Sequence, residues 1–93
     1  MILPVLYDEL NQRQRREVRE AYVLAQRGRC YHCEGRLDEE PPRHIQELPI
    51  NWRLFPPGFT RWPVHLHHCR QTGLTIGAVH SLCNAVLWQY HGE

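Results

Sequence analysis

Residues 64–85 read VHLHHCRQTGLTIGAVHSLCNA and decide the fold of this chain. Two short segments with recurring apolar residues, 64–68 and 74–79, flank a Thr72-Gly73 turn, which predicts a β-hairpin. A helix is expected directly after the second strand, over about residues 81–90. The order strand, strand, helix indicates an α+β fold with a ββα unit.

Side chains that suit zinc are interleaved with this unit. His80 and Cys83 have two residues between them, and an upstream pair, Cys30 and Cys33, has the same spacing. Zinc accepts three thiolates and one imidazole in a tetrahedral site, and each pair can bind it from one short turn. These four residues are predicted to hold a structural Zn²⁺. An all-cysteine site with Cys69 in place of His80 is the alternative.

The length of the chain gives such a metal a role in stability. A single domain over residues 1–93 buries only about 60 to 65% of its unfolded surface, so its core is marginal without a stabilising metal or cross-link.

Residues 1–6 are apolar but lack the basic flank and cleavage site of a signal peptide. We therefore expect a cytoplasmic protein without membrane contact, a monomer or weak dimer, in which disulfides are disfavoured.

The region before the hairpin divides into three segments. Residues 8–27 predict an amphipathic helix that is capped by Asp8 and ends before Gly28. Residues 30–37 have the composition of a zinc knuckle, and residues 38–63 are an insert. The expected apolar face of the helix consists of Leu10, Val18, Tyr22, Leu24 and Ala25.

The insert contains a Pro57-Gly58 pair that is typical of a turn. Residues 50–55 and 59–62 on either side of it predict a second short hairpin. We expect the aromatic side chains here to cover the small core, and contact with nucleic acid is the alternative. These aromatic residues are Trp52, Phe55, Phe59 and Trp62.

Basic charge is concentrated before the zinc knuckle. Residues 11–29 carry six arginines against Glu17 and Glu20, which gives this segment a charge of +4 in a chain of formal net charge +1. The guanidinium group binds phosphate oxygens in pairs, which suits a DNA backbone. A solvated helix face is the alternative. The candidate DNA-binding residues are Arg13, Arg15, Arg16, Arg19, Arg27 and Arg29.

A second group of polar residues suits hydrolysis of a phosphodiester. His67 and His68 point to opposite sides of their strand. Asn84 follows Cys83 directly, so a zinc ion at Cys83 would also fix Asn84. We expect His67 and Asn84 to hold a divalent ion and a neutral His68 to deprotonate a water. Packed or exposed histidines and a helix-capping asparagine are the alternatives.

Together these motifs resemble the HNH, or His-Me finger, endonucleases, most closely the phage recombination endonuclease VII family. The resemblance covers the charged N-terminal helix, residues 26–33 (QRGRCYHC), residues 65–68 (HLHH), Gly77 and residues 82–85 (LCNA). It implies a ββα-metal core over residues 64–91 on a zinc-bound scaffold. It also implies hydrolysis of DNA phosphodiester bonds with Mg²⁺, Mn²⁺ or a similar ion.

The resemblance assigns roles to individual residues. It places His68 as the general base and Asn84 as a ligand of the divalent ion. His67 stands where the family usually has aspartate, and other HNH nucleases use histidine there. His65 matches a histidine of the family and would assist at the phosphate. The four predicted zinc ligands occupy the zinc positions of the family.

Several departures limit what the resemblance implies. Cys69 and Arg70 replace an aspartate and a histidine, and Arg70 would contact a phosphate instead. His80 replaces a cysteine, and the insert is longer than usual. The C-terminal region that endonuclease VII uses for dimerisation and junction recognition has no counterpart, so junction resolution is not expected. His91 is a further candidate to reach the metal or the leaving group, with an exposed terminal histidine as the alternative.

The sequence thus predicts a small zinc-stabilised endonuclease that nicks or cuts DNA, most simply double-stranded DNA. Two other interpretations stay open. One is a zinc-stabilised nucleic-acid-binding module without catalysis. The other is a subunit that acts only within a larger phage DNA-processing complex.

Overall fold

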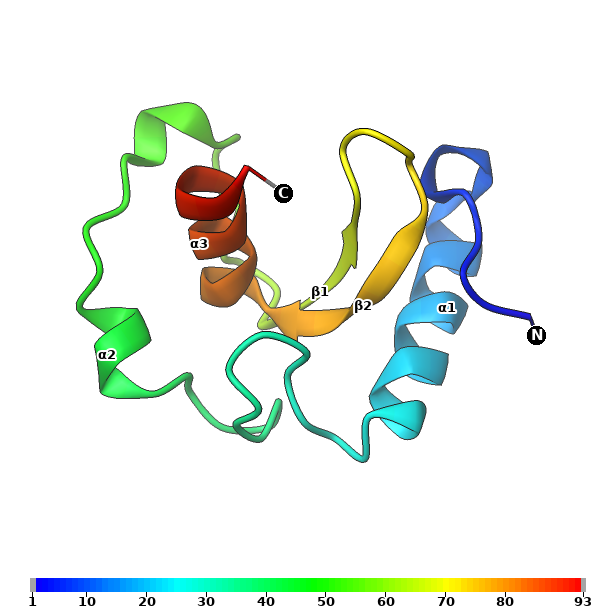
Figure 1. The fold of residues 1–93 in the computed structure, drawn as a ribbon, viewed down its shortest axis with the longest axis horizontal. Coiled ribbons are helices and arrows are strands. Elements are labelled where there is room, and N and C mark those ends of the chain that lie inside the picture. The colour runs from blue at the N-terminus through cyan, green and yellow to red at the C-terminus, as the bar shows by residue number, and fades with distance from the viewer. Residues whose placement is uncertain (1, 93) are drawn as a thin grey trace.

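The computed structural model describes residues 2–92, in which a β-hairpin lies between an N-terminal and a C-terminal helix (Figure 1). The segment between the zinc knuckle and the hairpin wraps around the C-terminal helix. The elements in chain order are η1 (Tyr7–Glu9), α1 (Gln12–Ala25), α2 (Arg43–Gln46), η2 (Trp52–Leu54), β1 (Val64–His68), β2 (Thr75–His80) and α3 (Ser81–His91).

The hairpin and the helix after it agree with the sequence-based expectation. β1 and β2 pair antiparallel, with Leu66 opposite Ala78 and His67 opposite Gly77. The register then shifts, so that His68 pairs with Thr75 and β2 has one extra residue. Such a bulge bends the strand and changes the direction of the side chains beside it. The predicted α+β fold with a ββα-like unit is confirmed.

The start of the first helix was predicted wrongly. α1 begins at Gln12, and Asp8 lies in the separate helix η1. Asn11 is the N-cap, because its side chain accepts a hydrogen bond from the backbone N–H of Gln14 at 2.8 Å. The Gln14 side chain accepts one in return from the Asn11 N–H at 3.0 Å. This reciprocal capping box satisfies two backbone donors and fixes the helix start.

The apolar face of α1 is narrower than predicted. Val18 is buried, and the Tyr22 hydroxyl forms a 2.9 Å hydrogen bond with the Thr75 hydroxyl. Leu24, predicted to lie on this face, is 82% exposed. Six residues beyond Val18 corresponds to about 240° around a helix, so Leu24 points to the solvent side.

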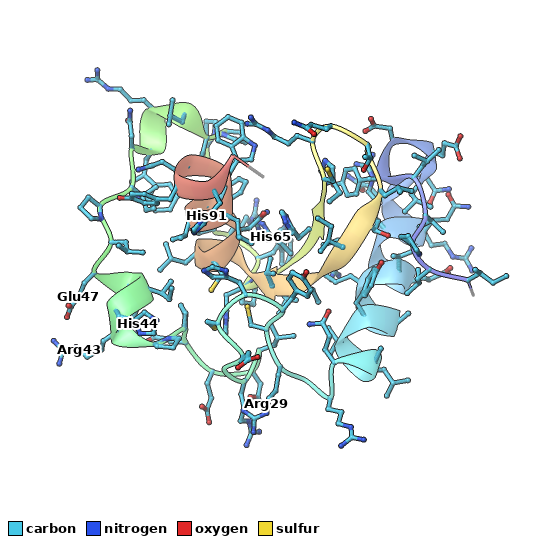
Figure 2. All side chains as sticks on the ribbon, in the orientation of Figure 1. Arg29, Arg43, His44, Glu47, His65 and His91 are labelled. Carbon is cyan, nitrogen blue, oxygen red and sulfur yellow. The ribbon has the colours of Figure 1, made fainter. Side chains whose placement is uncertain are left out.

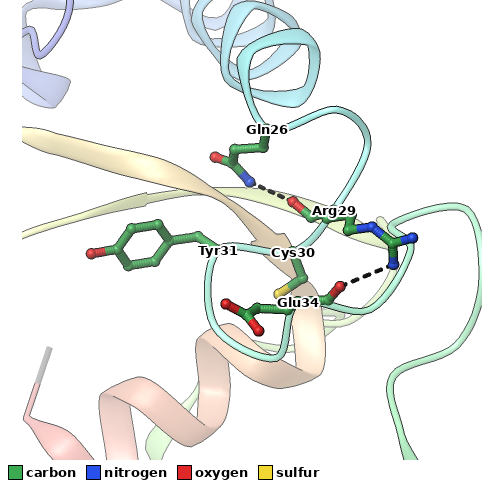
Figure 3. Close-up of a pocket in the computed structure, with 5 residues that line it drawn as sticks. All are labelled: Gln26, Arg29, Cys30, Tyr31 and Glu34. Carbon is green, nitrogen blue, oxygen red and sulfur yellow. Dashed lines mark hydrogen bonds between the residues drawn. The ribbon is translucent and has the colours of Figure 1, made fainter.

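One side chain completes the outer edge of β2. The Gln26 side chain accepts a hydrogen bond from the Ala78 N–H at 2.8 Å and donates one to the Ala78 carbonyl at 2.9 Å. It also donates to the Arg29 carbonyl at 2.6 Å (Figure 3). The N–H of Tyr31 donates to the same Ala78 carbonyl. Gln26 thereby takes the place of a third strand and ties α1 to the sheet.

The insert was predicted to form a second hairpin, and this is wrong. Residues 38–63, all of which the structure describes, contain no strand, and α2 and η2 lie there instead. Consecutive prolines at 56 and 57 remove two backbone donors that a sheet would need. The Gln89 side chain of α3 accepts a hydrogen bond from the Asn51 N–H at 2.9 Å, which holds the insert against that helix.

The predicted role of the insert's aromatic residues is confirmed only in part. Phe55 is buried and Phe59 is partly buried, as expected for core cover. Trp52 and Trp62 are 47% and 68% exposed, respectively, so they do not cover the core. Within residues 2–92, no helix is long and apolar enough to cross a membrane.

The first prediction concerns the close approach at Gly77. A Cβ atom at this position would lie 2.8 Å from Gln26 Oε1 and 3.1 Å from Tyr31 Cβ. We expect Gly77→Ala to destabilise the protein by about 1–3 kcal/mol, because the added methyl displaces the edge contacts of β2. Urea unfolding measures this loss. Gly35→Ala is the control, since its new Cβ would have its nearest neighbour at 3.5 Å; equal losses for both variants would contradict the explanation.

Candidate metal centre and histidine face

A tight turn places the first pair of cysteines. The Cys30 N–H donates to the Gly35 carbonyl at 2.8 Å, and the Glu34 N–H donates to the Cys30 carbonyl at 3.0 Å. Glu34 has φ +64°, a left-handed conformation that reverses the chain. The Arg29 guanidinium donates to the Glu34 carbonyl at 3.3 Å and closes the loop (Figure 3). Residues 30–37, which were predicted to be a zinc knuckle, therefore form a compact turn.

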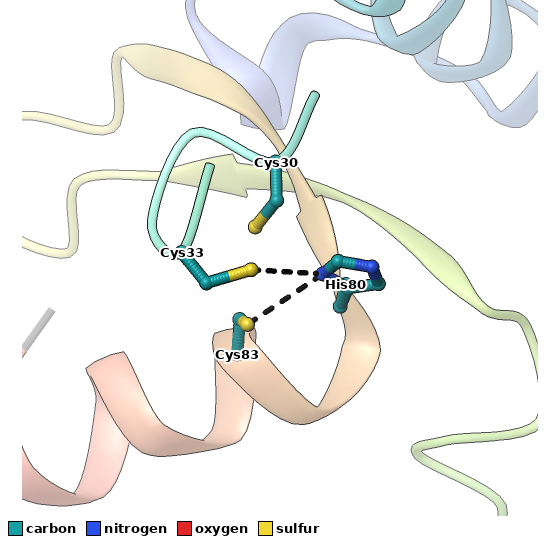
Figure 4. A group of neighbouring side chains, drawn as sticks. All are labelled: Cys30, Cys33, His80 and Cys83. Atoms are coloured by element: carbon teal, nitrogen blue, oxygen red, sulfur yellow. Dashed lines mark hydrogen bonds between the residues drawn. The ribbon is translucent and has the colours of Figure 1, made fainter. Parts of the chain in front are cut away.

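The second pair meets the first at the junction of β2 and α3. The ligand atoms of Cys30, Cys33, His80 and Cys83 all lie within 4.8 Å of one another (Figure 4). His80 Nδ1 lies 3.4 Å from Cys33 Sγ and 3.7 Å from Cys83 Sγ. Zinc bonds of about 2.3 Å to sulfur and 2.0–2.1 Å to nitrogen place those atoms about 3.6 Å apart in a tetrahedron. The spacing is compatible with a structural zinc site.

The hydrogen bonds of His80 select the ring nitrogen that such a site needs. His80 Nε2 lies 2.8 Å from the Arg36 carbonyl and 2.9 Å from the Glu39 carbonyl. Carbonyl oxygens only accept, so Nε2 carries the proton. Nδ1 is then the unprotonated nitrogen, and it faces the three sulfur atoms. A backbone carbonyl on the distal nitrogen is the usual way to orient a metal-binding histidine.

The thiols compete for protons because they lie so close together. A hydrogen bond from Cys83 lowers the pKa of Cys30 to about 4. The same contact raises the pKa of Cys83, and burial raises that of Cys33. Adjacent buried thiolates repel one another, and a divalent cation removes this penalty by taking the place of the protons. The donor set therefore fits a soft cation such as zinc.

Cys69, the alternative fourth ligand, is not part of this cluster. It lies at the start of the hairpin turn, where its N–H donates to the Leu74 carbonyl at 2.9 Å. No disulfide joins the four cysteines, all of which the structure describes. The predicted choice of His80 over Cys69 agrees with this arrangement.

The strand β1 presents two histidines toward α3, on what we call the histidine face, defined by His65, His67 and Asn84. The Asn84 amide donates to His65 Nδ1 at 3.0 Å. Figure 2 shows His65 between the hairpin and α3. Because side chains two residues apart share a strand face, His67 lies on this side as well. Its side chain is buried, with 2% exposed. The structure brings Asn84 to His65, whereas its predicted pairing with His67 stays a prediction.

His65 is enclosed by the insert. The Phe59 ring meets it edge-on, with ring centroids 4.8 Å apart. Burial lowers the pKa of His65, and the charge of Arg19 lowers it further, while hydrogen bonds with the backbone of Phe59 and Trp62 oppose this shift. The imidazole is therefore held neutral at pH 7, with Nδ1 as an acceptor.

His68 faces the opposite side, where the bulge places it against the N-terminal segment. Its ring stacks on Tyr7 with centroids 3.9 Å apart and an interplanar angle of 10°. The Arg15 guanidinium lies 3.9 Å from the same Tyr7 centroid. The stacked His68 ring leaves no room for a guanidinium on its side of Tyr7, so Arg15 lies on the opposite face of the Tyr7 ring. Burial lowers the pKa of His68, Asp8 raises it, and Arg15 lowers it.

The sequence analysis missed Tyr7. An isolated bridge between Leu6 and Leu74, with a 2.9 Å hydrogen bond from the Tyr7 N–H to the Gly73 carbonyl, brings this residue to the hairpin. This contact joins positions more than 60 residues apart in the chain. Local patterns of hydrophobicity contain no signal for such a contact.

The structure gives several of the predicted phosphate-binding arginines other partners. Arg13 lies 3.4 Å from Glu17 in an exposed ion pair, and Arg15 packs on Tyr7. Arg70, the predicted replacement contact, lies over the Trp88 ring at 4.4 Å. The three remaining candidates on and after α1 are exposed or half-buried, and Arg29 spans the knuckle. They are Arg16, Arg19 and Arg27.

His91 lies near the end of α3 and is exposed. Its ring centroid is 5.9 Å from that of His32 in the knuckle. It therefore approaches the zinc knuckle, and its predicted reach to the metal or leaving group stays a prediction.

Comparison with protein-family models, curated proteins and solved structures finds no match to this chain. In the part of the chain that the structure describes, the Cys30, Cys33, His80 and Cys83 cluster is the one group of three or more His, Cys, Asp or Glu side chains close enough to hold a metal ion. The protein therefore has an α+β fold with a buried Cys3His cluster.

Substitution of single cysteines tests the ligand set. Cys69→Ser is expected to retain one zinc per chain, whereas Cys83→Ser is expected to lose it, because Cys83, unlike Cys69, lies in the Cys3His cluster. Zinc content after gel filtration, measured by atomic emission, distinguishes the two variants. Loss of zinc from the Cys69 variant with retention in the Cys83 variant would exclude our assignment.

Removal of the metal tests its structural role. Structural zinc contributes about 10–16 kcal/mol in zinc-finger peptides near pH 7, which equals or exceeds the total stability of most small domains. Cys30 and Cys83 are themselves part of the buried core. A strong chelator should therefore abolish the cooperative thermal transition seen by circular dichroism, and added Zn²⁺ should restore it. An unchanged melting temperature after chelation would show that the cluster needs no metal.

Proposed function

We propose that this protein is a metal-dependent endonuclease of the ββα type that hydrolyses DNA phosphodiester bonds. The observation that carries the proposal is the position of Asn84. It is held one residue after a member of the Cys3His cluster, and its amide contacts the histidine face of the hairpin. The residue pattern of the HNH and endonuclease VII families, with His68 and Asn84 in functional positions, supports the same activity.

The candidate site offers donors for a divalent ion. His67 and Asn84 supply an imidazole nitrogen and an amide oxygen, and they belong to one face of the ββα unit. Two protein donors suit Mg²⁺ or Mn²⁺, because such ions keep several positions for water and phosphate oxygens. An ion held by these two residues would stabilise negative charge on the phosphate oxygens and on the leaving oxygen.

His68 is the general base in this proposal on the basis of the family pattern. Its ring lies on the other side of β1 from His67 and Asn84, so the phosphate would have to sit at the end of this strand to reach all three. The lowered pKa of His68 keeps the imidazole neutral, so that a ring nitrogen accepts a proton from the attacking water. Tyr7 stacks on the face of the ring and uses neither ring nitrogen. The stack therefore fixes the plane of the imidazole while both nitrogens stay able to form hydrogen bonds. Exposed arginines of α1 position the DNA backbone.

A second candidate function is a zinc-stabilised nucleic-acid-binding module without catalysis. It is favoured by one observation: among residues 2–92, no second group of His, Cys, Asp and Glu ligands lies beside the Cys3His cluster. A nuclease that works only as a subunit of a larger phage complex is the third. Supercoiled plasmid incubated with the protein and Mg²⁺, Mn²⁺ or chelator separates the first two, and activity only after addition of a partner indicates the third.

The decisive variant is His68→Ala. We expect it to keep its fold and zinc but to lose cleavage by a factor of about 10² or more, since the proton acceptor is removed. Plasmid relaxation, zinc content and circular dichroism are measured on the same preparation. His44→Ala, an exposed substitution on α2 (Figure 2), is the matched control and should cleave normally. Undiminished metal-dependent cleavage by the His68 variant would contradict the mechanism.

A further inference from the structure

Charge and aromatic residues are distributed unevenly along the chain. No aspartate or glutamate occurs between Leu48 and Gly92. The same stretch contains three arginines, at positions 53, 61 and 70, and all three tryptophans of the protein. A segment that combines exposed rings with positive charge and lacks carboxylates has the chemistry of a polyanion-binding surface.

Four of these rings contact one another in the structure. Together with Trp62, which follows Phe59 by three residues, they form what we call the aromatic surface; it consists of Trp52, Phe55, Phe59, Trp62 and Trp88. Phe55 is its centre, with ring centroids 5.6 Å from Trp52, 4.8 Å from Phe59 and 5.5 Å from Trp88. Phe59 in turn lies 4.8 Å from His65. Ring contacts therefore run without interruption from Trp52 and Trp88 to the histidine face.

The tryptophans of this surface are more exposed than residues that only pack against the core. Phe55 is buried, but Trp52, Trp62 and Trp88 are 47%, 68% and 37% exposed. Two of them form cation-π contacts with an arginine. The Arg70 guanidinium lies 4.4 Å from the Trp88 ring centroid, and the Arg61 guanidinium lies 5.7 Å from that of Trp62. Each such pair offers an aromatic face beside a fixed positive charge.

We propose that the aromatic surface binds unpaired bases of single-stranded DNA and leads that strand to the histidine face. Stacking on tryptophan needs a base whose face is open, and bases within a duplex are covered by their neighbours. Arg53, Arg61 and Arg70 supply phosphate contacts, and no carboxylate of this segment repels the strand. The binding itself stands without catalysis, whereas the delivery of a strand for cleavage rests on the proposed function.

Binding to an oligothymidylate of about 12 nucleotides tests this, since such sites cover roughly 4–16 nucleotides. Anisotropy of a labelled strand gives the affinity, without added divalent ion so that cleavage does not interfere. Tryptophan fluorescence gives an independent reading because every tryptophan lies on the aromatic surface. We expect quenching by the single strand and at least about tenfold weaker binding to a blunt duplex of the same length.

Variants assign the binding to this surface. Trp62→Leu should weaken single-strand binding by roughly 5- to 150-fold, and Trp62→Phe should restore most of the affinity. Trp62 is the most exposed of the three tryptophans, so its replacement leaves the core intact. Arg61→Gln should reduce the slope of log K against log salt by about 0.7. Arg43→Gln, an 89% exposed side chain on the outer side of α2 (Figure 2), is the control and should bind normally.

The outcomes separate this proposal from the nuclease proposal. Equal or tighter binding to the duplex, or unchanged affinity of Trp62→Leu, would overturn the aromatic surface as a single-strand site even if plasmid is cleaved. Preferential, Trp62-dependent binding by a protein that cleaves no DNA with any divalent ion would support the surface and reject the nuclease. Cleavage that prefers single strands and is lost in both Trp62→Leu and His68→Ala would support both.

Discussion

The convergence of Cys30, Cys33, His80 and Cys83 is the constraint on which the structure depends. These residues come from the knuckle, from the last position of β2 and from the first turn of α3. A small domain has too little apolar surface to hold three such segments by packing alone. A metal ion bound by these four side chains would replace part of that missing core, in which two of the cysteines are buried.

This constraint also positions the polar residues that are candidates for function. His80 ends β2, so the cluster fixes where the hairpin meets α3. Asn84 follows Cys83 and is thereby held against His65. On the other side of the hairpin, the bulge turns His68 toward Tyr7. Different contacts therefore position the two groups of residues. Asn84 depends on the Cys3His cluster, whereas His68 depends on contacts with the N-terminal segment.

Features with a local signal were predictable from the sequence, and features that need distant partners were not. The paired Cys-x-x-Cys and His-x-x-Cys spacings identified the members of the Cys3His cluster, and the turn at Thr72-Gly73 identified the hairpin, because each is encoded within a few residues. The start of α1 was also encoded locally, in the Asn11 and Gln14 capping box, but the apolar spacing alone extended the helix too far. Tyr7 on His68 and Gln26 on Ala78 join segments more than 50 residues apart, so no window of sequence contains them.

The distribution of charge adds a second region, besides α1, to which a nucleic acid is expected to bind. The arginines of residues 11–29 suggested α1, but over residues 8–47 eight arginines face nine carboxylates, and the net charge of that region is −1. Over residues 48–92 three arginines face none, so the net charge is +3. At an ionic strength of 0.15 M, interactions beyond about 8 Å are largely screened, and local charge decides the attraction of a phosphate. The carboxylate-free region also contains the aromatic surface and the histidine face. A DNA strand bound there lies beside the candidate catalytic residues, whereas a DNA strand bound only to the outer face of α1 does not.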